Sequence, residues 1–486
     1  MEKEQPFSNL IYEYYLMRFR FGYYKPGDTL PPVEILCQEF RVAENTVKTA
    51  LRRLREEGYI DLRGGHATKV LFEQTEQEYR NYITGFYSKR REAHSDLYAS
   101  AGPVFIPLLL EGLRRMSGDE LDTLAFMAKR GETDDLLRFN YLLLEKLNNP
   151  LVMNLFWETL FFWGVPFSRR EGRPSQYAPG AVRERISRLL DGAKAQSWDC
   201  VRDALLTFQR GDFSAADGFL RQNIPPYPKE GQIPFVWRIY REHPQICFSL
   251  SVQLLHEIYM GSYRQRTYLP SYAAMAKLYG ASVSTVRRTI AGLHEIGAVE
   301  PVNGKGIRIC PIGEPCETAD FSNTTVLRNL SYYIQAFDLG RYTCEGVTRD
   351  FLQTLAPEVR DNLIRRLEKE LRADQCVVSV FHFLNCVVNH HPLQGIREIY
   401  GTIYALFLWG APLKGSTGET PEPEQESVRF TRLMIQAIKE NDAEGCAAAV
   451  KELLDGHFAA AERFLRQKGL SPEALRFSST IHFSLT

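Results

Sequence analysis

The chain has 486 residues, 44% of them hydrophobic, and its 59 basic and 59 acidic residues give a formal net charge of zero. A neutral chain has no overall field that attracts nucleic acid, so any such affinity must come from local basic patches. The most apolar runs, residues 155–165 and 403–411, are shorter than the roughly twenty residues of a bilayer-spanning helix. Length and composition therefore favour a protein of several domains without a membrane partner.

The amino terminus and the cysteines bear on the cellular compartment of the protein. Residues 1–6 form a short, charged segment, unlike a secretory signal, and an amphipathic helix is predicted directly after it. The nine cysteines are odd in number and scattered, which is typical of reduced thiols. We therefore expect a cytoplasmic protein.

A module of about seventy residues occurs twice, at residues 7–70 and 248–309. The two copies align at a constant offset of 239 without a gap from Gly22 to Val70. Identical pairs include Gly22 with Gly261, Leu30-Pro31 with Leu269-Pro270, Thr46-Val47 with Thr285-Val286, Gly58 with Gly297 and Gly65 with Gly304. Such a register predicts an internal duplication.

Each copy predicts three helices followed by a β-hairpin. Pro31 or Pro270 is expected at the start of the second helix, where the missing N–H costs nothing. The third helix is expected to begin near Asn45 or Ser284, both residue types that cap helices well. A glycine closes it, and the second copy continues into an Asn303-Gly304 hairpin turn. This pattern predicts a winged helix-turn-helix in each copy.

Together these residues resemble the GntR-type bacterial transcription regulators. The resemblance lies in the Leu-Pro start of the second helix, the Thr-Val-Lys or Thr-Val-Arg core of the third, the Leu-x-x-x-Gly closure and the glycine-bearing wing. It implies a recognition helix and a wing that bind DNA. Two arginine positions of the family read Glu34 and Glu44 in the first copy, and Ala273 and Val283 in the second.

Local charge favours the second copy as the DNA reader. Residues 7–72 hold ten Lys and Arg against eight Asp and Glu, a net charge of +2, whereas residues 248–312 hold seven against three, a net charge of +4. The resemblance places DNA contacts at the third helix and wing of each copy. A solvated face would be the simpler interpretation of an isolated run of charges, but within a winged-helix frame we favour DNA contact. The candidate residues are Asn45, Thr46, Lys48, Arg52, His66, Lys69, Ser284, Thr285, Arg287, Arg288, Lys305 and Arg308.

The region after each copy shows apolar residues at helical spacing, which predicts an all-helical domain. It is similar to the FCD domain, a ligand-sensing partner of GntR-type heads. The resemblance rests on Phe139-Asn140 nine residues before Asn149-Pro150, on Phe381-His382 nine residues before His391-Pro392, and on residues 436–442. Many such domains bind a metal through one Asp and three His, but only His382 fits such a set here. We therefore expect no metal, and we expect no cofactor.

Four residues mark the candidate effector pocket, which would suit a small apolar or carboxylate ligand. They are Asn140, Trp163, His382 and Trp409. A core histidine that hydrogen-bonds to a neighbour is the simpler interpretation of His382. A packed helix end is the simpler interpretation of either tryptophan.

The sequence thus predicts a mainly α protein with a pseudo-twofold repeat. Its expected domains are winged helices at residues 1–73 and 241–314, each followed by a helical effector and dimerisation domain, at residues 74–240 and 315–486. The expected function is transcription regulation by a monomeric pseudo-dimer or a homodimer on a double-stranded DNA operator, modulated by a small-molecule effector. The alternative is a sensor or protein-interaction module with degenerate heads. No nucleophile, phosphate loop or zinc set points to an enzyme.

Overall fold

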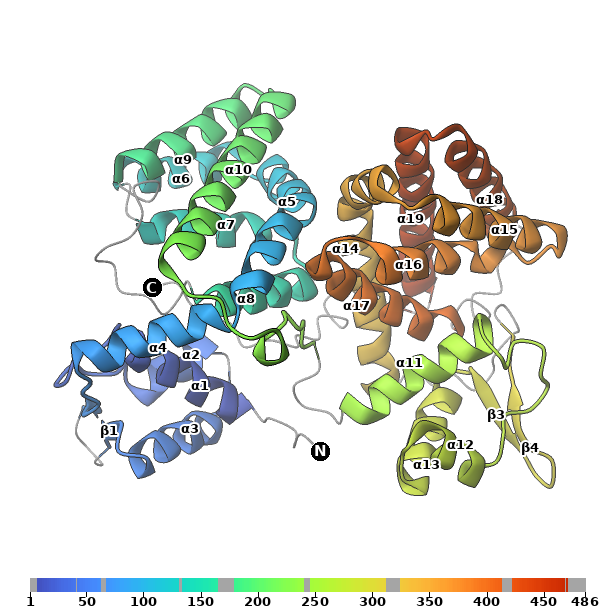
Figure 1. Ribbon diagram of the computed structural model, residues 1–486, viewed down its shortest axis with the longest axis horizontal. Helices are drawn as coiled ribbons and strands as arrows, with labels where there is room; N and C mark the ends of the chain where they lie inside the picture. The colour runs from blue at the N-terminus through green and yellow to red at the C-terminus, as the bar shows by residue number, and fades with distance from the viewer. Residues whose placement is uncertain are drawn as a thin grey trace. The chain divides into compact units, whose positions relative to one another are not determined.

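The computed structural model describes residues 7–40, 42–62, 67–130, 133–164, 179–239, 245–311, 324–412, 422–467 and 469–470. The chain is mainly helical, as predicted, and divides into two compact units, one formed mainly by residues 1–243 and the other by residues 244–477 (Figure 1). In the described part, no helix combines the length and apolar character needed to cross a bilayer.

The first unit begins with three helices and a short hairpin, which we call the first head. Its elements are α1 (Phe7–Arg20), α2 (Val33–Phe40), α3 (Glu44–Glu56), β1 (Ile60–Asp61) and β2 (Lys69–Val70). The strands pair antiparallel, with Ile60 opposite Val70. Its core is rich in aromatic rings, and Tyr15, Phe19 and Phe40 are almost fully buried.

Helix α3 is amphipathic because its apolar residues recur every three or four positions. Val47, Leu51 and Leu54 are buried under α1 and α2, whereas the charged residues between them face solvent. The helix ends where Gly58 adopts a φ of +79°, a conformation that glycine reaches without strain.

The rest of the first unit is a bundle of helices, the first bundle. Its helices are α4 (Glu76–Ser88), α5 (Arg91–Arg114), α6 (Gly118–Arg130), α7 (Thr133–Glu145), α8 (Pro150–Trp163), α9 (Pro179–Lys194) and α10 (Trp198–Asn223). Its core is formed by apolar residues such as Phe139, Leu143 and Ile186. Helices α5 and α7 pack very closely at Gly112, where an added Cβ would meet the Leu143 carbonyl oxygen at 2.2 Å.

Residues 224–239, which we call the strap, run back over the first bundle after α10. The backbone N–H of Ile233 donates to the Lys89 carbonyl at 2.7 Å, and the Trp237 indole N–H donates to Asn154 Oδ1 at 2.6 Å. The strap is therefore part of the first unit's core, although its only regular element is the short turn η3 (Lys229–Gly231).

The second unit begins with the second head. Its elements are α11 (Gln245–Tyr259), α12 (Tyr272–Tyr279), α13 (Val283–Glu295), β3 (Val299–Val302) and β4 (Gly306–Ile309). The expected hairpin is present, with Val302 paired to Gly306 and a φ of +74° at Gly304.

Several backbone contacts of the first head recur 239 residues later. The Leu30 N–H donates to the Thr68 carbonyl at 2.9 Å, as the Leu269 N–H does to Ile307. At the end of the third helix, the Tyr59 N–H donates to Leu54, as the Ala298 N–H does to Leu293. The aligned sequences therefore form the same local hydrogen bonds within each unit.

The second bundle completes this unit. It consists of α14 (Thr324–Thr354), α15 (Pro357–Arg372), η4 (Cys376–Val378), α16 (Ser379–His390), α17 (Gln394–Gly410), α18 (Glu422–Glu440) and α19 (Ala443–Gln467). The His391-Pro392 junction before α17 serves as Asn149-Pro150 does before α8. A side chain accepts a backbone N–H in each, Asn149 Oδ1 from Leu151 and His391 Nδ1 from Leu393.

The third helices begin slightly earlier than the sequence predicts. Helix α3 begins at Glu44 after Ala43, which makes no side-chain cap. Helix α13 begins at Val283, and Ser282 rather than Ser284 caps it, accepting the Thr285 N–H at 3.0 Å. Asn45 and Ser284 are therefore helical residues, which places their side chains on the helix surface.

Candidate nucleic-acid interface

The outer face of α3 is the candidate contact surface of the first head. Asn45, Lys48 and Arg52 are exposed along it, and Thr46 is half-buried. Lys69 is exposed on β2, whereas His66 lies outside the described residues. The described candidates therefore belong to one helix and one strand of the same small fold.

An ion pair reduces the basic character of this face. Lys48 Nζ lies 2.6 Å from Glu44 Oε1, one helical turn away, and both side chains are more than half exposed. The hydrogen bond to Glu44 raises the pKa of Lys48, so the lysine is charged but its nearest partner is an anion. A phosphate would have to compete with this carboxylate.

A second pair lies at the end of α3. Arg53 Nε donates to Glu57 Oε1 at 3.0 Å, and its guanidinium lies 3.7 Å from the centre of the Tyr12 ring. The Tyr12 hydroxyl donates to Glu57 Oε2 at 2.5 Å, and burial together with this bond raises the pKa of Tyr12 to about 12. Arg53 is therefore held against the head.

The second head presents a more basic third helix. Ser284, Arg287 and Arg288 are exposed on α13, and Thr285 is half-buried. The Arg287 guanidinium lies 5.6 Å from the centre of the Tyr272 ring, and no ion pair among the described residues joins it to an acid. Val283, at the position of Glu44, is 40% exposed.

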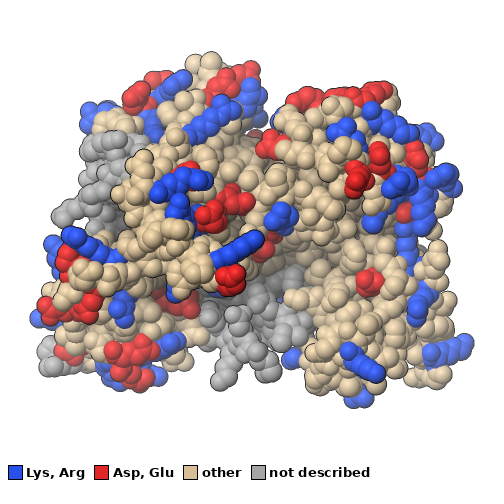
Figure 2. Space-filling view, in the orientation of Figure 1, with Lys and Arg blue, Asp and Glu red and all other residues tan. Residues whose placement is uncertain are grey.

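The hairpin of the second head has one paired and one exposed cation. Arg308 Nη2 lies 2.8 Å from Glu300 Oε2 across the strands, so its charge is partly neutralised. Lys305 is exposed beside the Gly304 turn. In Figure 2, blue predominates over the second head, whereas red and blue mix over the first. The surface of the second head is thus more basic than that of the first, in agreement with their net charges of +4 and +2.

The predicted effector-pocket residues divide between the two bundles, two in each. Asn140 is half-buried on α7, and Trp163 stacks on Tyr98 at 4.1 Å at the end of α8. His382 is buried on α16, where its Nε2 lies 3.0 Å from Glu370 Oε1, and Trp409 is buried at the end of α17.

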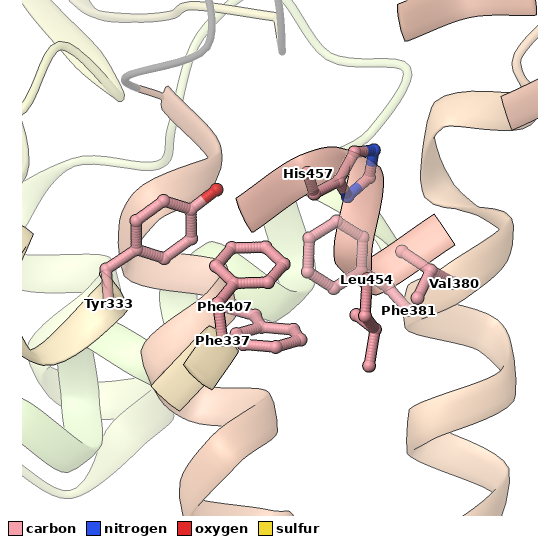
Figure 3. Close-up of a pocket in the computed structure, with 7 residues that line it drawn as sticks. All are labelled: Tyr333, Phe337, Val380, Phe381, Phe407, Leu454 and His457. Atoms are coloured by element: carbon pink, nitrogen blue, oxygen red, sulfur yellow. The ribbon is translucent and has the colours of Figure 1, made fainter. Parts of the chain in front are cut away.

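A small apolar cavity lies in the second bundle. Seven residues of α14, α16, α17 and α19 line it, none of them among the predicted four: Tyr333, Phe337, Val380, Phe381, Phe407, Leu454 and His457 (Figure 3). Phe337 and Phe407 stack at 4.1 Å, and the imidazole of His457 lies above them. The free space is about that of one water molecule, so a larger ligand would require side chains to move.

Across the described residues, no group of three or more His, Cys, Asp or Glu is arranged to hold a metal. Near His382, Glu370 is the one carboxylate within hydrogen-bond distance in the contacts recorded, and it is already bound by Arg264. His382 therefore makes a polar contact with Glu370 inside the second unit.

Comparison with known proteins assigns the amino-terminal module. Residues 8–70 match "Bacterial regulatory proteins, gntR family". The first head is a GntR-family DNA-binding domain. The match covers α1 to β2, and its third helix carries the paired Glu44 and Lys48 described above.

Three solved structures are similar to parts of the chain. The Streptococcus agalactiae GntR is 16% identical over 44% of this chain, with a TM-score of 0.22. The Listeria monocytogenes protein Lar is 11% identical over 46%, with a TM-score of 0.21, and E. coli McbR/YncC is 15% identical over 46%, with a TM-score of 0.24. Each similarity covers 99% of the other chain. No curated protein matches, so the assignment rests on the GntR-family match of the first head.

Of two ion pairs formed by residues of the heads, one could have been predicted from the sequence and the other could not. The Glu44–Lys48 pair was readable, because oppositely charged side chains four residues apart meet on a helix. The Arg264–Glu370 pair was not, because its members are 106 residues apart.

Proposed function

We propose that this chain is a non-enzymatic transcription regulator in which two winged-helix heads, each with its own helical bundle, are fused as an internal pseudo-dimer. The observation that carries the proposal is the GntR-family match of the first head, whose third helix lies exposed beside its hairpin. In this class of fold the third helix enters the major groove and the wing contacts the backbone or an adjacent groove.

The second head supports the proposal by its sequence register and its local contacts. Its hydrogen bonds recur at the offset of 239, and its net charge of +4 exceeds that of the first head. Arg287, Arg288 and Lys305 are exposed to bind phosphates, and Val283 suits an apolar contact with a thymine methyl group. We assign the stronger half-site contacts to this head.

The same reasoning gives the first head the weaker half-site. Lys48, Arg52 and Lys69 are exposed, but Glu44 neutralises Lys48. Glutamate accepts a hydrogen bond from cytosine N4, which gives this head a different base preference. Two unlike heads on one chain suit an asymmetric operator.

Effector binding in the helical bundles is the finer part of the proposal. The cavity of Figure 3 offers an apolar lining with His457 at one side, which suits a small ligand with one polar group. A ligand changes DNA binding only if its affinity differs between two arrangements of the protein.

DNA binding by the purified full chain tests the proposal. The probe is a duplex from the gene's own upstream region, titrated at two salt concentrations. We expect Arg287→Ala/Lys305→Ala to weaken binding most and Lys48→Ala/Arg52→Ala to weaken it less, because each neutralised phosphate contributes about 0.9 to the logarithmic salt slope. The control Lys194→Ala/Arg202→Ala removes two exposed cations from the first bundle and should bind as the wild type does.

A sensor or protein-interaction role is the second candidate, and the Glu44–Lys48 pair favours it for the first head. In that case the first head would bind a protein surface rather than DNA. Wild-type binding no tighter than to an unrelated duplex of equal length, with no salt dependence, would reject the regulator and leave this second role.

A further inference from the structure

The second head is joined to the second bundle by buried and half-buried polar side chains that we call the polar clasp. The clasp consists of Arg264, Glu370, His382, His256 and Tyr404. Arg264 lies in the turn after α11, and its Nη1 and Nη2 donate to Glu370 Oε1 and Oε2 at 2.7 and 2.6 Å. This two-bond geometry fixes the orientation of the guanidinium as well as its distance.

Glu370 is the centre of the clasp. Its side chain is only 3% exposed, and His382 Nε2 donates to the oxygen that Arg264 Nη1 also binds. Burial alone would raise the pKa of Glu370, but the hydrogen bonds from Arg264 and His382 outweigh it and lower the pKa to about 2. The carboxylate is therefore ionised at neutral pH and depends on both partners, because an uncompensated buried charge is strongly unfavourable.

A second polar contact joins the same two parts. His256, on α11 of the second head, lies with its Nδ1 2.6 Å from the hydroxyl of Tyr404 on α17. Tyr404 is 7% exposed, so this bond is shielded from water. The head is thus held at two separated points, its first helix and the turn that follows.

The first head is joined to the first bundle by aromatic packing. Phe21 meets Phe86 edge to face at 5.0 Å, and an added Cβ at Gly164 would lie 3.1 Å from the Phe21 ring. Lys25 occupies the position of Arg264 and is exposed. The two units therefore hold their heads by different chemistry.

The clasp shares its helices with the cavity of Figure 3. His382 directly follows Phe381, which lines the cavity from α16, and Tyr404 lies three residues before Phe407, which lines it from α17. The rings of Phe381 and Tyr404 also lie 6.2 Å apart. A movement of α16 around the cavity displaces His382, and a movement of α17 displaces Tyr404.

We propose that Glu370 is a positioning residue that fixes the second head on the second bundle, and that the bundle's cavity acts on this head through the polar clasp. This inference rests on the proposed function in assigning DNA to the head. In this proposal the clasp has two states: either Arg264 is paired with Glu370, or the head separates from α15. The first head, held by rings, is not released by the same change.

Amide hydrogen exchange of the full chain tests the clasp without DNA. We expect Glu370→Gln to accelerate exchange about tenfold in α11–α13 while leaving α1–α3 and the core of α14 unchanged. Tyr404→Phe, which keeps the ring and removes one hydrogen bond, should give a smaller change in the same helices. Asp212→Asn is the matched control, because Arg185 binds Asp212 through two bonds of 2.8 and 2.7 Å inside the first bundle. Equal acceleration of α14 and α11, or none in either variant, would overturn the assignment.

Val380→Ile tests the link to the cavity, since it adds one methyl group to the cavity wall. We expect a change of about threefold in exchange of α11–α13 in the wild-type background, and less than half of it when Glu370→Gln is also present. Additive effects, or no effect of Val380→Ile, would reject the link.

DNA binding separates this inference from the proposed function. If the wild type binds duplex, Glu370→Gln should weaken binding about tenfold without changing the salt slope, because the phosphate-contacting residues are untouched. A changed slope or unchanged affinity would contradict the positioning role. If the wild type does not bind, the proposed function fails, and the exchange results alone decide whether the clasp positions the head.

Discussion

His94 is a buried titratable residue of the first bundle that no proposed site uses. It is 5% exposed on α5, and its ring lies 5.2 Å from Tyr98 and 5.7 Å from Tyr87. Burial lowers its pKa to about 4, with smaller and opposing effects of Arg90 and Asp217. The imidazole is therefore neutral in the folded chain at neutral pH.

We expect the first unit to lose stability as pH falls from about 6.5 to 4. Across this window the unfolded chain binds a proton at His94 that the folded chain does not, and a depression of this size corresponds to up to about 3 kcal/mol. His94→Phe should remove this part of the pH dependence. The measurement is denaturant unfolding at several pH values, and equal pH dependence in both proteins would contradict it.

Gly164 is constrained twice, by its backbone and by its neighbours. Its φ is +73°, and an added Cβ would meet the rings of Phe21 and Phe86 at 3.1 and 3.3 Å. We expect Gly164→Ala to destabilise the first unit by about 1–3 kcal/mol. Alanine is strained in the left-handed region, and its Cβ would displace the rings that join the first head to the first bundle. Thermal unfolding measures the effect.

Gly211 provides the matched control for this substitution. It lies within α10, and nothing stands within 4 Å of an added Cβ. Gly211→Ala should stabilise the chain by about 0.5–1 kcal/mol. Equal effects of the two substitutions would show that backbone and ring contacts at Gly164 are unimportant.

At the scale of the element, the positive charge of α3 is reduced by an acid at each end, since the helix holds four basic and two acidic residues. Glu44 and Glu56 stand at opposite ends of this helix, and Glu44 pairs with Lys48. The amino-terminal end of a recognition helix is the part that contacts base edges.

Glu44→Gln should therefore tighten DNA binding and steepen its salt dependence by about 0.9 in logarithmic slope, because Lys48 becomes able to neutralise a phosphate. Glu56→Gln removes the same charge from the far end of α3 and should change the slope less. The measurement is duplex binding at several salt concentrations. Equal slopes for the two variants would show that α3 does not face the duplex by its amino-terminal end.

The elements themselves were largely predictable, because their signals are local. Asn303-Gly304 predicted the hairpin of the second head, and Gly58 predicted the end of α3. The partners of Glu370 and Trp237 were not predictable, since Arg264 and Asn154 lie 106 and 83 residues away and are selected by packing. The predicted pocket residues remain a prediction, because two of them lie in each bundle and the cavity of Figure 3 is lined by other residues.

At the scale of the whole molecule, two heads on one chain should be sufficient to bind one operator. We expect one chain per duplex in native mass measurements, because in the proposed arrangement each unit supplies one head for one half-site. Two chains per duplex would instead indicate a homodimer with four heads. Arg287→Ala/Lys305→Ala should weaken the complex without changing this ratio, which separates affinity from stoichiometry.

The unlike surfaces of the two heads have a consequence for inheritance. In a homodimer every substitution enters both DNA-contacting surfaces at once, so a change that weakens one half-site weakens the other equally. In a chain that carries two heads, a substitution changes only one of them. Glu44 and Val283 occupy the same position of the aligned modules, yet one is an acid and the other is apolar. If both heads bind DNA as we propose, each can acquire its own base preference while the other continues to bind the operator.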